Sequence, residues 1–149
     1  MSHRAVRGIG ILVLAAIACG PKEAPQTGDE SRSAALEILP GTTVDDKIDK
    51  AKDPVDCKRF TVEDKTPATV NIYFDNPSVG AEVTLRDMFG GAVGMVKHQA
   101  AADKDSIANV ILKDGTYFLE IAATKGASVY TIEVMLGNDS GSLGIPRPE

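Results

Sequence analysis

The chain has no tryptophan, and aromatic residues make up only 5% of its 149 residues. Its core must therefore be built mainly from valine, isoleucine, leucine and alanine. The sequence contains two cysteines, which are too few for a disulfide framework, and a single histidine beyond the N-terminal segment, whereas zinc prefers three or four N/S ligands. Basic residues number 16 against 21 acidic ones, and they form no concentrated block, which argues against nucleic-acid binding.

Residues that could form a catalytic site are equally scarce. Asn138–Gly141 resembles the Gly-Asp-Ser-Gly of serine proteases, but a nucleophilic serine needs a base and an oxyanion hole held by a rigid scaffold. Beyond the N-terminal segment the only histidine is His98, which we expect to end a strand in solvent. We therefore expect no enzyme. A minor alternative is a hydrolase whose concave site would gather His98 with a serine and an acid.

The first twenty residues have the features of an export signal. Arg4 and Arg7 precede the apolar run Gly8–Ala18, which falls short of the roughly 20 residues that span a bilayer. The run leads through small residues to Cys19, and this resembles the lipobox of bacterial lipoproteins. The resemblance implies cleavage before Cys19 and lipidation of it with fatty acids such as palmitate. The alternative is an ordinary signal peptide cut after Ala16 or Ala18.

Lipidation would make Cys19 a durable tether, because two or more acyl chains hold a protein stably to a membrane. By the lipoprotein sorting rule, Gly20 after the cysteine favours the outer membrane. The next residues are rich in proline, glycine, serine and charge, which predicts a flexible spacer. We expect four parts: a signal peptide 1–18, the lipidated cysteine and linker 19–33, a β-sandwich domain 34–136 and a flexible tail 137–149.

The central part of the chain has the alternating pattern of half-buried strands. Apolar residues recur at every second position, as at Val70, Ile72 and Phe74, and turn-forming residues separate the runs. This predicts an all-β antiparallel sandwich. The expected strands are Ala35–Leu39, Thr43–Ile48, Cys57–Val62, Ala68–Phe74, Glu82–Asp87, Ala92–Lys97, Ser106–Leu112, Thr116–Ala122 and Ser128–Leu136.

Asp114 and Gly115 form a turn signal between two apolar-rich runs, because both residue types tolerate positive φ. We therefore expect the strands on either side to pair as a β-hairpin. Tyr117, three residues after Asp114, is either a tyrosine corner whose hydroxyl bonds to nearby backbone or a plain core residue.

Five motifs in order make the chain similar to the bacterial pre-peptidase C-terminal domain, a small jelly-roll-like β-sandwich. The resemblance covers about Leu36 to Leu136. The motifs are Leu39–Ile48, Asp53–Val62, Val83–Gly90, Leu112–Ile121 and Tyr130–Val134.

The resemblance implies a jelly-roll-like fold and a role other than catalysis. Such domains are usually appendages of secreted enzymes with binding, stabilising or secretion roles, and some members bind calcium. This sequence departs from the family pattern at three positions. Cys57 and Lys58 stand where aromatic residues are common, and Glu82 stands where aspartate is common.

Calcium is the most serious chemical candidate. Asp45, Asp46, Asp53 and Asp56 flank one predicted loop, and calcium prefers six to eight oxygen ligands from carboxylates and loop carbonyls. We take these four aspartates as candidate metal ligands. The alternative is that they are solvated loop residues, since the sequence lacks an Asp-x-Asp-x-Asp-Gly loop.

Carbohydrate binding would need exposed aromatic rings on which a sugar can stack. The candidates for stacking are Tyr73 and Phe89, with Phe118 as a weaker third. Cys57 is expected to be a partly buried small residue, although the neighbouring Lys58 and Arg59 would favour its reactive thiolate.

These observations lead to one expected function and one alternative. We expect a non-catalytic, lipid-anchored β-sandwich that mediates interaction with a protein or polysaccharide at the bacterial cell envelope. The alternative is a calcium- or carbohydrate-binding module of the envelope.

Overall fold

The computed structural model describes residues 28–137, and these residues form strands and turns without a helix. The predicted lipidation site Cys19, the signal segment and residues 138–149 lie outside the described residues. The strands are β1 (Leu36–Glu37), β2 (Thr43–Asp49), β3 (Val55–Val62), β4 (Thr66–Phe74), β5 (Gly80–Arg86), β6 (Ala92–Lys97), β7 (Asp105–Leu112), β8 (Gly115–Lys125) and β9 (Ala127–Leu136). Within the described range, no helix is long and apolar enough to cross a bilayer.

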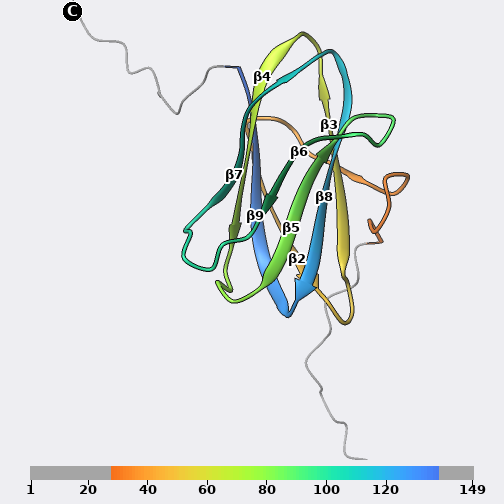
Figure 1. Ribbon diagram of the computed structural model, residues 1–149. Helices are drawn as coiled ribbons and strands as arrows, with labels where there is room; N and C mark the ends of the chain where they lie inside the picture. Colours follow the sequence, from red (N-terminus) through yellow and green to blue (C-terminus); the bar gives the residue numbers. More distant parts are fainter. Residues whose placement is uncertain (1–27, 138–149) are drawn as a thin grey trace, which may run out of the picture.

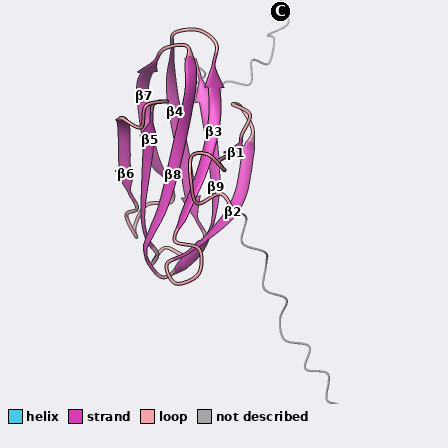
Figure 2. Cartoon of the chain, turned by 90° about the vertical axis from the view of Figure 1, so that its right-hand side faces the viewer, coloured by secondary structure: helices cyan, strands magenta, loops and turns pink. Residues whose placement is uncertain are grey.

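The strands form two sheets that pack face to face (Figure 1). The first sheet has the order β1-β3-β8-β5-β6, which can be followed across Figure 2, and the second has the order β2-β9-β4-β7. All pairings are antiparallel except that of β1 with β3. The expected antiparallel β-sandwich is therefore confirmed.

Alternation of side chains explains how the two layers hold together. On β8, Tyr117, Leu119 and Ile121 point inward, and on β9 Tyr130 and Ile132 face them from the other sheet, all buried. The core contains one large aromatic stack, in which the Phe60 and Tyr117 rings lie 5.9 Å apart. Aliphatic side chains fill most of the remaining space, as the composition predicts.

The connections mostly cross between the sheets. Among the described strands that follow each other in the chain, only β5 and β6 are hydrogen-bonded partners. The predicted hairpin at Asp114–Gly115 is therefore wrong: β7 pairs with β4, whereas β8 pairs with β3 and β5. The turn carries the chain from one layer to the other, so the two strands flank the core instead of sharing a ladder.

Tyr117 stabilises this crossing as a tyrosine corner. Its hydroxyl donates to the main-chain oxygen of Lys113 at 3.2 Å and accepts from the Lys113 amide at 3.1 Å. Gly94 shows a comparable constraint where β6 approaches β7. A Cβ on Gly94 would lie 2.5 Å from Cγ2 of Ile107, so only glycine fits.

The folded domain begins earlier in the chain than predicted, within the linker 19–33 that composition assigns to a flexible spacer. Asp29 falls within that predicted spacer, yet it is fully buried. Its main-chain oxygen accepts from the Cys57 amide at 2.7 Å, which places the segment 28–35 beside β3. In Figure 1 this segment is orange and lies beside β3.

Candidate functional site

An acidic cluster lies between β2 and β3, beside the N-terminal segment. It consists of Asp29, Asp46 and Asp56, each of which offers a carboxylate oxygen within 4.8 Å of the others. Asp46 comes from the inward face of β2, and Asp56 from the inward face of β3. Three segments far apart in sequence therefore bring three carboxyl groups together.

Lys58 lies among these carboxylates. Its Nζ atom donates to Oδ2 of Asp29 at 2.5 Å and also to Oδ2 of Asp46. The side chains of Lys58 and Asp29 are completely buried, and that of Asp46 is 14% exposed. A buried ammonium group is stable only when paired and hydrogen-bonded, and these two carboxylates raise the pKa of Lys58 against the opposing effect of burial.

Asp56 occupies the inner end of the cluster. The Tyr130 hydroxyl donates to its Oδ2 at 2.7 Å, while its Oδ1 is buried without a hydrogen-bond partner. Burial, reinforced by the charges of Asp29 and Asp46, raises the pKa of Asp56 to about 7. Burial and the carboxylate of Asp56 likewise raise the pKa of Tyr130.

The structure brings together two of the four aspartates expected to bind calcium. Asp46 and Asp56 belong to the cluster. Asp45 points to the other face of β2, where its Oδ1 accepts from the Thr131 hydroxyl at 2.6 Å. Asp53 lies in the loop before β3, near enough to Asp29 for its pKa to be raised by burial and by that charge.

The arrangement does not fit a divalent cation as it stands. Calcium coordination needs six to eight oxygens around the metal. Here the Lys58 ammonium already contacts two of the three clustered carboxylates inside a buried space. A divalent cation among the same oxygens would lie beside a positive charge in a medium of low dielectric constant, where repulsion is strong.

A second notable feature is the turn between β5 and β6, residues Asp87–Gly91, here called the Phe89 turn. Phe89 is 86% exposed at its tip, and Met88 beside it is 59% exposed. Oδ1 of Asp87 accepts from the amides of Phe89 at 2.9 Å and Gly91 at 2.8 Å. Gly90 adopts a φ of 94°, a value that favours glycine.

Two arginines support the Phe89 turn from below. Arg86 donates to the main-chain oxygen of Gly90 at 3.3 Å and forms a two-pronged ion pair with Glu120 at 3.1 and 3.2 Å. Arg32 of the N-terminal segment lies against Gly90, and its guanidinium carbon is 5.9 Å from the centre of the Phe118 ring. The turn is thus held in one conformation while its apolar tip stays in water.

The two residues expected to stack on sugars are separated. Tyr73 is 37% exposed near the end of β4 in the second sheet, whereas Phe89 follows β5 in the first sheet. β5 begins where β4 ends and runs back along the sandwich, so the two rings lie near opposite ends (Figure 1). Phe118 is half-buried beneath Arg32.

His98 was expected to lie in solvent at the end of a strand, and this prediction is wrong. Its side chain is 3% exposed, and its ring lies 4.8 Å from that of Phe74. Nδ1 is 2.6 Å from Oδ2 of Asp105, and Nε2 is 3.2 Å from the main-chain oxygen of Pro77. The histidine therefore joins the loops at this end of the sandwich, and both ring nitrogens face acceptors. Ser140 of the protease-like motif Asn138–Gly141 lies outside the described residues.

Cys57 is the only cysteine in the described residues, and it is 2% exposed beneath the N-terminal segment. The sequence suggested that Lys58 and Arg59 would favour its thiolate. Instead, burial and the charge of Glu120 raise the pKa of Cys57 to about 11. Lys58 fails to lower it because its side chain points to the opposite face of β3, toward the acidic cluster.

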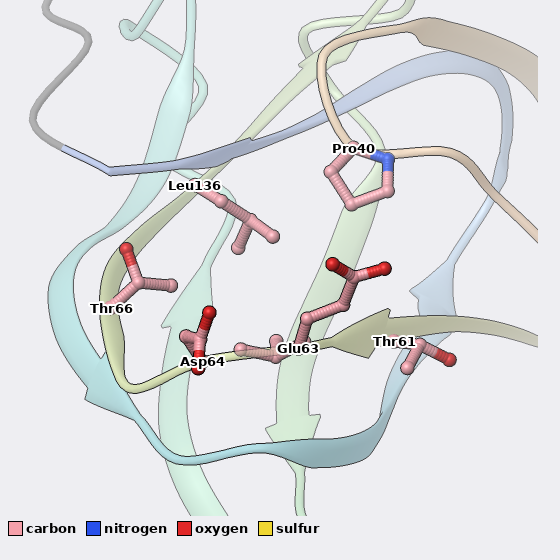
Figure 3. A pocket seen from close by; sticks show the side chains of 7 residues that line it. Pro40, Thr61, Glu63, Asp64, Thr66 and Leu136 are labelled. Atoms are coloured by element: carbon pink, nitrogen blue, oxygen red, sulfur yellow. The ribbon is translucent and has the colours of Figure 1, made fainter.

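A hollow of about 320 Å³ lies at the end of the sandwich, between the Pro40 loop and the β3–β4 turn (Figure 3). Its lining supplies the carboxylates of Glu63 and Asp64 and two threonine hydroxyls, but neither histidine nor cysteine. The complete lining is Pro40, Thr61, Val62, Glu63, Asp64, Thr66 and Leu136.

Sequence reasoning missed Asp29 and Lys58, the two fully buried ends of one ion pair. Asp29 lies in a stretch whose composition is typical of a spacer, and no local pattern separates it from Glu30. Lys58 did carry a signal, since it occupies an inward position of a predicted strand, between Asp56 and Phe60. A lysine at such a position requires a buried acidic partner.

No family model and no curated protein matches this sequence. Solved structures do match the fold. The pre-peptidase C-terminal domain of a collagenase from Bacillus anthracis superposes with a TM-score of 0.59 at 20% identity, covering 67% of this chain and 93% of that domain. A periplasmic inhibitor of g-type lysozyme from Aeromonas hydrophila, PliG, gives a TM-score of 0.43 at 10% identity, with coverages of 68% and 95%. A mitogen from Yersinia pseudotuberculosis gives 0.41 at 14% identity, with coverages of 70% and 93%. The sandwich of this chain is therefore similar in fold to a pre-peptidase C-terminal domain.

Proposed function

We propose that this protein is a non-catalytic, lipid-anchored interaction module of the bacterial cell envelope that binds a partner protein through the Phe89 turn. One observation carries the proposal: the Phe89 side chain is exposed, and the turn that holds it is fixed by hydrogen bonds. Large apolar side chains held rigidly in water are typical of binding hot spots, because little conformational entropy is lost when a partner covers them.

The chemistry of the turn favours a protein over a polysaccharide. The side chain of Asp87 is used to hold the turn, and that of Arg86 is paired with Glu120. Sugar sites combine a stacking ring with polar groups that fix the orientation of the ligand. Here the tip offers Met88 and Phe89, and the second candidate ring, Tyr73, lies near the other end of the sandwich.

The anchor belongs to the same proposal. Cys19, once lipidated, would tether the chain to a membrane, with the outer membrane favoured by Gly20. The residues between Cys19 and Asp29 would form the spacer. Arg32 lies against Gly90, so the N-terminal segment that would follow the spacer contacts the proposed binding surface.

Site-specific photo-cross-linking in intact cells tests the proposal. A photoreactive phenylalanine analogue at position 89 should capture a discrete envelope protein. The same analogue at Ile111, 58% exposed on β7, serves as the matched control and should not capture it. Capture of polysaccharide at position 89 would favour the carbohydrate-binding alternative, and equal capture at both positions would refute a role for the turn.

A further inference from the structure

The interior of this sandwich holds a cluster of charged side chains that takes no part in the Phe89 turn. Asp29, Asp46 and Asp56 place three carboxyl groups together, with Asp53 nearby, while Lys58 supplies a single ammonium group among them. Lys58 and Asp56 occupy core positions of β3 that an aliphatic residue would fill at lower cost. We therefore expect this buried charged cluster to have a specific role.

The ammonium group joins three parts of the fold. It extends from β3 and donates to Asp46 on β2 of the opposite sheet and to Asp29 of the N-terminal segment. A metal ion among the same carboxylates would make the same connections. The ammonium achieves them with a covalently attached charge, so the contacts do not depend on the cation concentration of the surroundings.

We propose that the Lys58 ammonium takes the place of a divalent cation in this acidic cluster and fixes the N-terminal segment to the sandwich. It follows that the fold is independent of calcium. It also follows that the carboxylates become available to a divalent cation once the ammonium is removed. Oxygen ligands alone would then surround the space, which suits a hard cation such as calcium.

Calcium dependence tests the first consequence. The full chain with Cys19→Ser, purified in a non-ionic detergent, should melt at the same temperature in EDTA and in millimolar calcium chloride. Calorimetric titration should detect no calcium binding. A calcium-dependent rise in melting temperature that Asp46→Asn abolishes would overturn the proposal, because the carboxylates would then bind metal with Lys58 in place.

Removing the ammonium tests the second consequence. Lys58→Ala should lower the melting temperature in EDTA by more than about 5 °C, since it leaves buried carboxylates without a counter-charge. Millimolar calcium should restore part of that loss, and adding Asp46→Asn should cancel the gain. Arg59→Ala, which removes the neighbouring exposed cation on the outward face of β3, is the matched control and should show no calcium response. A folded Lys58→Ala protein that ignores calcium would contradict the proposal.

A third measurement remains decisive even if Lys58→Ala fails to fold. In the Cys19→Ser chain, Cys57 is the only thiol, and it lies beneath the N-terminal segment. Asp29→Asn keeps the sandwich strands intact but removes the charge that binds the segment to Lys58. Thiol labelling of native Cys57 should then accelerate at least about tenfold. An acceleration of this size corresponds to a local opening of the segment that is about 1.4 kcal/mol more favourable. Labelling at the unaltered rate would show that this pair does not fix the segment.

Discussion

Lys58 and Asp29 are 29 residues apart in sequence, yet Nζ of the lysine donates to Oδ2 of the aspartate at 2.5 Å with both side chains completely buried. The pair determines where the folded domain begins. Residues that composition assigns to a spacer become part of the sandwich, because one of their carboxylates neutralises a charge in the core. The same segment brings Arg32 beneath the Phe89 turn, so the core charge and the exposed tip are structurally linked.

The carboxyl group of Asp56 predicts a pH dependence with a definite sign. Its pKa rises from 3.8 to about 7 in the folded protein, so between these values the folded state binds more protons than the unfolded state. The contribution of Asp56 to stability is therefore greatest in acid and is lost as pH rises through about 7. Asp56→Asn removes this titration.

From pH 5 to pH 8, the melting temperature of Asp56→Asn should accordingly rise relative to that of the unaltered protein. Circular dichroism melts at matched ionic strength measure it. An Asp56→Asn difference that stays constant with pH would contradict the raised pKa.

Tyr117→Phe should destabilise the domain by about 1–2 kcal/mol, because the two hydrogen bonds between its hydroxyl and Lys113 are lost while the ring remains in the core. Urea unfolding followed by circular dichroism measures this loss. Tyr73→Phe removes a hydroxyl from an exposed ring and should change the free energy of unfolding by less than about 0.5 kcal/mol. Equal effects of the two substitutions would rule out a structural role for the corner.

Asp87 should act on binding through the shape of the Phe89 turn. Asp87→Ala removes the acceptor for the Phe89 and Gly91 amides and should weaken partner binding several-fold by loosening the tip. Asp87→Asn keeps an oxygen acceptor in the same place and should bind nearly as well as the unaltered protein. If binding instead follows the charge, with Asn as weak as Ala, the carboxylate contacts the partner directly.

Cys19 should carry the membrane anchor. Cells fed an alkyne-labelled palmitate analogue should label the chain, and the chain should fractionate with membranes. Cys19→Ala should abolish the labelling and leave the chain unprocessed, whereas Cys57→Ala should retain both properties. Labelling that persists in Cys19→Ala would exclude the lipoprotein hypothesis.

Much of the fold could be predicted because local pattern decides it. Alternation of apolar residues located the strands to within a few residues, as on β6, where the expected and observed bounds are both Ala92–Lys97. Pairing was harder to predict. The Asp114–Gly115 turn is compatible both with a hairpin and with a crossing between sheets, and the choice depends on contacts of β7 with β4 that lie far apart in sequence.

The candidate sites were predictable only in part for the same reason. Phe89 stood out as an exposed aromatic residue in a glycine-rich turn, and it is exposed. The acidic cluster combines Asp46 and Asp56 with Asp29 and Lys58, and the partnership of the last two exists only after folding. A count of nearby acids therefore indicated a metal site, whereas the structure shows a lysine among them.

The most direct test of the proposed function is the affinity of the cross-linked partner, once purified, for three forms of the protein. Biolayer interferometry should show that Phe89→Ser weakens binding by at least about tenfold relative to the unaltered chain, a typical loss for a hot-spot aromatic residue. Ile111→Ser, which removes an exposed apolar side chain from β7, should bind as the unaltered chain does. Unchanged affinity of Phe89→Ser would contradict binding through the Phe89 turn.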